Sequence, residues 1–154
     1  MLAVAAAHRL GVVTTPRWPM VAAHLLVEAD GGEHTAALAA LSATDSAWHI
    51  DPLVPLVLEE IDAPVMTVDA AAEVVARLLA LLDYPVARSL AALAESHDYP
   101  GGLIGDAYQA AEWLDCDCHE GTEERLVATR MQERFEKAPR LEIPAALAKA
   151  LLSD

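Results

Sequence analysis

The stretch that begins at Thr67, TVDAAAEVVARLLALL, constrains the fold of this chain more than any other. Its charged residues are Asp69, Glu73 and Arg77, which stand four apart and therefore share one narrow stripe of a helix. A helix that is apolar over the rest of its circumference must be covered on several sides. Thr67 can cap it, and Asp69 lies in the first turn, where the helix dipole favours negative charge. The stretch predicts an all-α fold, a compact bundle of about seven to nine helices around a central buried helix over residues 68–82.

The chain of 154 residues has the length of one domain and can bury one sizeable core, so we expect a single helical domain over residues 1–154. The hydrophobic fraction is 55%, but no apolar run approaches the roughly 18 residues that a membrane span needs. The start, MLAVAAAHRLG, lacks the basic segment of a secretory signal. Two cysteines one residue apart form no disulfide framework. We therefore expect a reducing, cytoplasmic setting.

Charge is the strongest compositional signal. Ten Lys and Arg residues face 24 Asp and Glu residues, which gives a net charge of −14 and disfavours binding to nucleic acid. Between Arg17 and Arg77 the chain has ten acidic residues and no Lys or Arg. Such a surface would attract a basic protein partner, and the alternative is that it only keeps an alanine-rich fold soluble. The candidate partner-binding residues are Asp115, Asp117, Glu120, Glu123 and Glu124.

Caps and breakers divide the rest of the chain into further helices. Asp51 is expected to cap one helix, with Pro52 at its first position. Thr122 is expected to cap the clearest amphipathic helix, which Pro139 ends. No window alternates at a period of two, so we expect no strands. The other helices are expected at residues 2–10, closed by Gly11, and at 19–29, 33–42, 86–96, from about 106, and from 144 to 152. Residues 61–64, which end in Pro64, are expected to stop the helix that Asp51 begins.

Several short segments in the first half of the chain carry a resemblance. They are residues 19–23 (PMVAA), 38–42, Asp45, Trp48, 51–52 and 58–59. Together they are similar to the first half of small, uncharacterised helical proteins that are common in high-GC bacterial genomes. The resemblance implies an all-α fold and a bacterial source, and it brings no activity with it.

The segment DCDCHE places two thiols, an imidazole and three carboxylates in six residues. Cys116, Cys118 and His119 could bind zinc if the chain is extended there, since two cysteines at this spacing in a helix would point about 200° apart. Zinc would need a fourth ligand, for which His97 or His49 is available. The alternative is an ordinary helix end with one buried thiol. We expect no cofactor, with zinc as the exception to test.

A pocket between helices is the other kind of site that the sequence allows. Trp48, His49 and Trp113 could surround a cavity for a small molecule. The alternative for the adjacent Trp48 and His49 is a packed tryptophan beside a hydrogen-bonded histidine. Glu59 and Glu60 could form a carboxylate pair for acid–base catalysis, but adjacent acids on a helix point apart. No catalytic residue is therefore predicted.

These patterns favour a non-enzymatic, acidic interaction protein that binds a basic protein partner, as immunity proteins, antitoxins and inhibitors do. One alternative is a small-molecule-binding helical protein, or a small enzyme, with a pocket between helices. A second is a metal-thiolate protein that uses the Cys-x-Cys-His segment. Because a small chain this rich in alanine and leucine has few polar residues to cover its surface, we also expect that it can form a homodimer.

Overall fold

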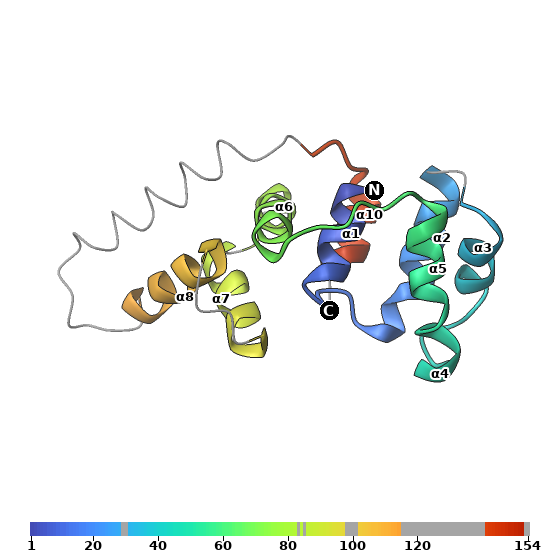
Figure 1. Cartoon of the computed structure of the whole chain (residues 1–154), viewed down its shortest axis with the longest axis horizontal. Coiled ribbons are helices and arrows are strands. Elements are labelled where there is room, and N and C mark those ends of the chain that lie inside the picture. Colours follow the sequence, from blue (N-terminus) through green and yellow to red (C-terminus); the bar gives the residue numbers. More distant parts are fainter. Residues whose placement is uncertain (29–30, 83, 85, 98–101, 115–140, 153–154) are drawn as a thin grey trace. The chain divides into compact units, whose positions relative to one another are not determined.

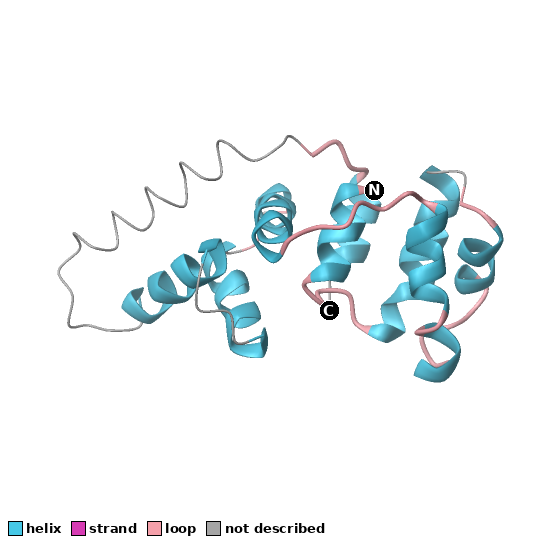
Figure 2. Ribbon diagram, viewed as in Figure 1, coloured by secondary structure: helices cyan, strands magenta, loops and turns pink. Residues whose placement is uncertain are grey.

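The structure is a computed structural model that describes residues 1–28, 31–82, 84, 86–97, 102–114 and 141–152. Every regular element in these ranges is a helix, and they contain no strand (Figures 1 and 2). The all-α prediction is therefore confirmed. No helix in the described ranges combines the length and the apolar character needed to cross a membrane.

The contacts between elements group into two units, Met1–Met66 with Glu142–Asp154, and Thr67–Leu141. The single domain expected from the sequence stays a prediction. The expected amphipathic helix between Thr122 and Pro139 lies outside the described residues.

The first unit brings the first and last helices of the chain side by side (Figure 1). α2 packs against α3 and α10, and α3 also packs against α5. Five consecutive residues of α1, from Ala3 to Ala7, are buried, because small alanine side chains let neighbours approach closely on several sides. The elements are α1 (Leu2–Arg9), the 3-10 helix η1 (Thr15–Arg17), α2 (Trp18–Glu28), α3 (Glu33–Ala39), α4 (Ala47–Ile50), α5 (Leu53–Glu60) and α10 (Ala145–Leu152).

Charged side chains from distant parts of the chain cap two helix ends in this unit. Nη2 of Arg17 donates hydrogen bonds to the carbonyl oxygens of Lys149 and Ala150, in the last turn of α10. Carbonyls in that turn have no partner within their own helix. At the start of α3, the carboxylate of Glu60 accepts hydrogen bonds from the backbone amides of His34 at 2.8 Å and Thr35 at 2.9 Å. Tertiary contacts therefore complete both helices.

The cap expected at Asp51 is wrong. α5 begins at Leu53, with Pro52 in the flanking position and no side-chain cap. Asp51 instead continues the backbone of α4, and its Oδ1 accepts a hydrogen bond of 2.8 Å from the hydroxyl of Thr15. The carboxylate thus joins α4 to η1, a contact across 36 residues that no local pattern could reveal.

The second unit contains α6 (Val68–Leu81), α7 (Val86–His97) and α8 (Gly102–Leu114), with α7 and α8 packed closely together and both touching α6. Thr67 caps α6 as expected, because its Oγ1 accepts a hydrogen bond of 3.3 Å from the amide of Ala70. Half of the residues of α6 are buried, and its polar stripe is the less buried side. The stripe continues to Leu81, which stands four residues after Arg77 and is 56% exposed.

α8 begins at Gly102, ahead of the start expected near Asp106. Gly102 has a φ of +67°, which glycine adopts at little cost. A Cβ at this position would overlap Oδ1 of Asp69, in the first turn of α6. The glycine therefore provides both the backbone turn into α8 and the space for its approach to α6.

Candidate functional site

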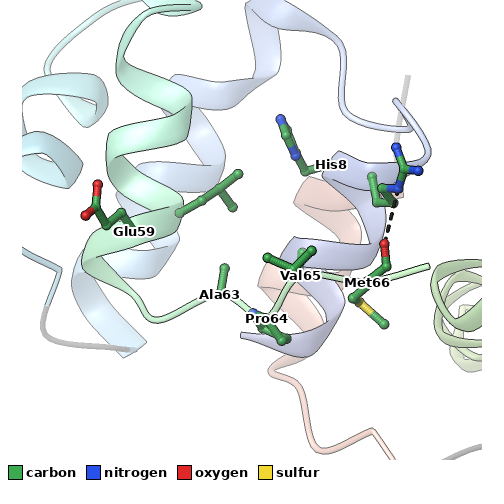
Figure 3. Close-up of a pocket in the computed structure, with 9 residues that line it drawn as sticks. His8, Glu59, Ala63, Pro64, Val65 and Met66 are labelled. Atoms are coloured by element: carbon green, nitrogen blue, oxygen red, sulfur yellow. Dashed lines mark hydrogen bonds between the residues drawn. The ribbon is translucent and has the colours of Figure 1, made fainter. Parts of the chain in front are cut away.

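A cavity of about 410 Å³ lies in the first unit between α1, α5 and the segment that follows α5 (Figure 3). Its volume is within the range of about 300–1,000 Å³ that is usual for small-molecule sites. Most of the lining is apolar, and three charged or titratable side chains join it. The lining residues are Ala5, His8, Arg9, Leu58, Glu59, Ala63, Pro64, Val65 and Met66.

The local sequence after α5 shapes one wall of this cavity. The helix stops at Ile61, and Asp62 takes a φ of +48°, in the left-handed region that Asp tolerates better than most residues. The amide of Ala63 then donates a 2.9 Å hydrogen bond to the carbonyl of Leu58, which gives one carbonyl group at the end of the helix a partner. Pro64 follows and prevents any return to the helix. The stop expected at residues 61–64 is confirmed, and residues 63–66 line the cavity.

Arg9 connects the far end of this wall to α1. Its Nε donates a hydrogen bond of 3.2 Å to the carbonyl oxygen of Met66, 57 residues away, and the dashed line in Figure 3 marks it. The bond holds the guanidinium group beside the cavity, where its other nitrogens can still donate. Arg9 thus brings the one guanidinium group of the lining to the cavity.

The other two polar groups do not form a catalytic pair. Partial burial, and then the nearby charge of Arg9, lower the pKa of His8 from its ordinary value, which favours the neutral imidazole. Its ring lies edge-on to that of Trp18, with 5.7 Å between the ring centres. In Figure 3 the carboxylate of Glu59 points away from His8. The lining contains no Ser, Thr, Cys or Lys that could act as a nucleophile. The arrangement suits binding.

The carboxylates of the first unit are largely exposed and uncompensated. None of the exposed acidic side chains forms an ion pair with a residue in the described ranges, where the one recorded ion pair joins His34 to Glu60 at 2.8 Å. Arg9 and Arg17 direct hydrogen bonds to backbone carbonyls. The exposed acidic residues of this unit are Glu28, Glu33, Asp45, Asp51, Glu59, Asp62 and Glu142.

Trp48 and His49 lie on α4, at the surface of the first unit, and do not line the cavity described above. Trp48 is 88% exposed, so the expected packed tryptophan is wrong. The expected hydrogen bond of His49 is present, between its Nδ1 and the hydroxyl of Ser46 at 3.4 Å. Ile50 is the buried residue of this short helix and takes the packing position instead.

The structure does not describe the side chains of the other predicted site residues. Trp113 lies on α8, of which only the backbone is described at that position, so a pocket around it stays a prediction. The metal candidates Cys116, Cys118 and His119 lie outside the described residues, as do the partner-binding candidates Asp115, Asp117, Glu120, Glu123 and Glu124. Within the described ranges, no three His, Cys, Asp or Glu side chains gather as a metal site would require.

The cavity was not foreseen from the sequence, although His8 and Arg9, which line it, are both exposed. The only local signal was the pair of polar residues just before Gly11. The residues that face them are more than 45 positions away. Comparison with known proteins adds no further constraint: no family model, curated protein or solved structure matches this chain. The resemblance to helical proteins of high-GC bacteria stays a prediction.

Proposed function

We propose that this protein is an acidic interaction protein that binds a basic protein partner through its surface carboxylates. The observation that supports this proposal is the set of seven exposed acidic side chains of the first unit, none of which is neutralised by an ion pair with a described residue. Unpaired surface charges of one sign create a potential that attracts an oppositely charged partner and speeds its encounter.

The use of the arginines in this unit supports the same proposal. Arg9 binds the carbonyl of Met66, and Arg17 binds the end of α10. These cations stabilise the fold by satisfying backbone groups, and the acidic side chains are left to the solvent. Glu60 is different, because its carboxylate is occupied by α3 and is not available to a partner.

The proposal extends to features that rest on the sequence alone. It includes the acidic segment with Asp115, Asp117, Glu120, Glu123 and Glu124 as a further contact region, a cytoplasmic setting, and an immunity, antitoxin or inhibitor role. A homodimer is compatible with such a role.

The test is capture of partners from the native organism at low salt, followed by association rates of any captured protein across a salt series. We expect the association rate to fall steeply with added salt, because exposed charges are screened over about 8 Å at physiological ionic strength and about 3 Å at 1 M. Changing Glu28, Glu33 and Asp62 to their amides should slow association several-fold with little change in dissociation, since surface charge mainly steers encounter. A partner bound equally fast in molar salt would contradict the proposal.

The cavity beside Arg9 favours a second candidate function, binding of a small molecule with an apolar body and an acidic group. The apolar lining would take the body, and the guanidinium group would hold the carboxylate, a charge-assisted contact that is stronger than a neutral hydrogen bond. Thermal unfolding with a panel of aliphatic and aromatic carboxylates tests it. We expect some of the acids to raise the melting temperature and their amides to leave it unchanged. In Arg9→Gln the acids should have no effect. If no acid stabilises the protein, this second function is wrong.

A further inference from the structure

Trp48 is the most unusual surface residue of the first unit. Its side chain is 88% exposed, whereas Trp18 in the same unit is buried. A tryptophan carries a large apolar surface, and when it stands in water it often anchors a protein interface.

The backbone around Trp48 holds it in place. Ile50 is fully buried below it, and Asp51 is tied to η1 through the hydroxyl of Thr15. On the other side, the amide of Ser42 donates a 2.7 Å hydrogen bond to Oδ2 of Asp45, and the amide of Asp45 donates one of 3.0 Å to the carbonyl of Ser42. Because these bonds hold the backbone, a partner that binds here has only the two χ angles of the indole left to order.

The charged side chains nearest to Trp48 in the sequence are two carboxylates, and His49, directly beside Trp48, also acts on Asp45. Asp45 precedes Trp48 by three residues and Asp51 follows it by three on the same helical turn, so Asp51 lies on the same face. Both are exposed, and neither forms an ion pair with a described residue. Hydrogen bonds from the amide and hydroxyl of Ser42 lower the pKa of Asp45, which keeps it ionised. The chain has no Lys or Arg from residue 18 to residue 76.

We propose that Trp48 is the anchor for the basic partner, with its indole face receiving an arginine or lysine side chain that Asp45 and Asp51 flank. Tryptophan is the best aromatic acceptor for a cation, and adjacent carboxylates would add charge-assisted hydrogen bonds to the same side chain. An uncharged apolar partner would not use these two carboxylates. The inference rests on the proposed function, and it identifies Trp48 as the place on the surface where the basic partner binds.

The experiment uses a defined probe, a peptide of alternating glycine and arginine, with the glutamine version of the same peptide as the neutral control. The Nε1–H resonance of Trp48, assigned by its loss in Trp48→Phe, is followed by NMR during titration at low salt. We expect it to shift saturably with the arginine peptide and to stay unchanged with the glutamine peptide. Trp48→Ala should weaken binding at least about tenfold, and Trp48→Phe less, because an interface anchor loses most when its ring is removed.

Matched variants distinguish binding at Trp48 from a general effect of the acidic surface. Asp45→Asn and Asp51→Asn remove the charge but keep an oxygen that can accept the bonds from Ser42 and Thr15, so both should weaken binding. Glu28→Gln makes the same charge change at the last residue of α2. The first residue of that helix, Trp18, directly follows η1, which packs against α4, so Glu28 lies about 15 Å along α2 from the end nearer to α4. This change should weaken peptide binding less. Val27→Ala, at an exposed apolar residue near Glu28, should have no effect.

The outcomes distinguish this inference from the proposed function. If the arginine peptide binds in a salt-sensitive way but Trp48→Ala binds equally well, Trp48 is not the anchor and the acidic surface alone remains as proposed. If no arginine peptide binds at low salt, both proposals fail. If sedimentation shows a homodimer that Trp48→Ala dissociates, with unchanged peptide affinity, a second copy occupies this surface and the inference is wrong.

Discussion

Glu60 accepts two hydrogen bonds from Thr35, one from its backbone amide at 2.9 Å and one from its hydroxyl at 2.8 Å. Thr35 is fully buried, so its hydroxyl needs a partner inside the protein. The residue before α3 is Gly32, which has no side chain to cap the helix. A carboxylate from the end of α5 therefore takes the place of the usual capping residue and ties the two helices together.

Replacing Glu60 by Gln should make the first unit less stable at pH 7 and less sensitive to acid. Burial by itself raises the pKa of Glu60, but hydrogen bonds from the amides and side chains of His34 and Thr35 outweigh it and lower the pKa to about 2, from 4.5. The folded protein thus binds a proton at the Glu60 carboxylate more weakly than the unfolded chain does. Its stabilising effect is complete above about pH 4.5 and is lost as the pH falls towards 2.

Urea unfolding followed by circular dichroism between pH 7 and pH 2 measures this effect. The difference between the urea midpoints of Glu60→Gln and of the unchanged protein should shrink as the pH falls from about 4.5 to about 2. Glu59→Gln is the control, because Glu59 is exposed and forms no recorded bond at the start of α3. Equal midpoints for Glu60→Gln and the unchanged protein at pH 7 would show that the cap contributes nothing.

Replacing Gly32 by Ala should destabilise the first unit through Glu60. A Cβ at position 32 would lie 2.7 Å from Oε1 of Glu60, so the carboxylate would have to shift against the hydrogen bonds that hold it at α3. We expect a cost of about 1–3 kcal/mol in unfolding free energy, as for other overpacked sites. In a Glu60→Ala background the same change should cost much less, and a double-mutant cycle measures the coupling. Additive effects would contradict the proposed clash.

The buried and exposed sides of α6 should respond very differently to a charge. Leu79 is 6% exposed and Leu81 is 56% exposed, on the same helix. Leu79→Asp should cost more than about 4 kcal/mol, the range of unpaired charges in a core, whereas Leu81→Asp should stay within about 0.5 kcal/mol. Val75→Asp should behave like Leu79→Asp. Thermal unfolding decides, and a soluble, cooperatively melting Leu79→Asp protein would mean that the buried side of α6 is misplaced.

Replacing Arg17 by Ala should loosen α10. The guanidinium group satisfies two carbonyls in the last turn of that helix, and hydrogen bonds of charged groups contribute about 1.5–3 kcal/mol each when they are well formed. Hydrogen exchange should then show faster exchange of the amides of residues 145–152. Glu142→Ala, which changes an exposed residue just before the helix, is the control and should leave exchange unchanged. Unaltered protection in Arg17→Ala would rule out a capping role.

The sequence by itself determined the features that depend on neighbours a few residues apart. The four-residue spacing of Asp69, Glu73 and Arg77 predicted the less buried stripe of α6, and Thr67 predicted its cap. Gly11, with a φ of +64°, and Pro64 marked real helix ends. Helix periodicity and capping act over one or two turns, so the local pattern contains the information that they need.

Only the tertiary structure decided which distant groups meet. Asp51 reads as a helix cap but binds Thr15, and Trp48 reads as a core residue but stands in solvent while Ile50 packs beneath it. Two lining residues of the cavity, Arg9 and Met66, are joined by a hydrogen bond across 57 residues. A side chain with several available partners takes the one that packing brings within about 3 Å, and that choice depends on the whole fold and not on the residues beside it.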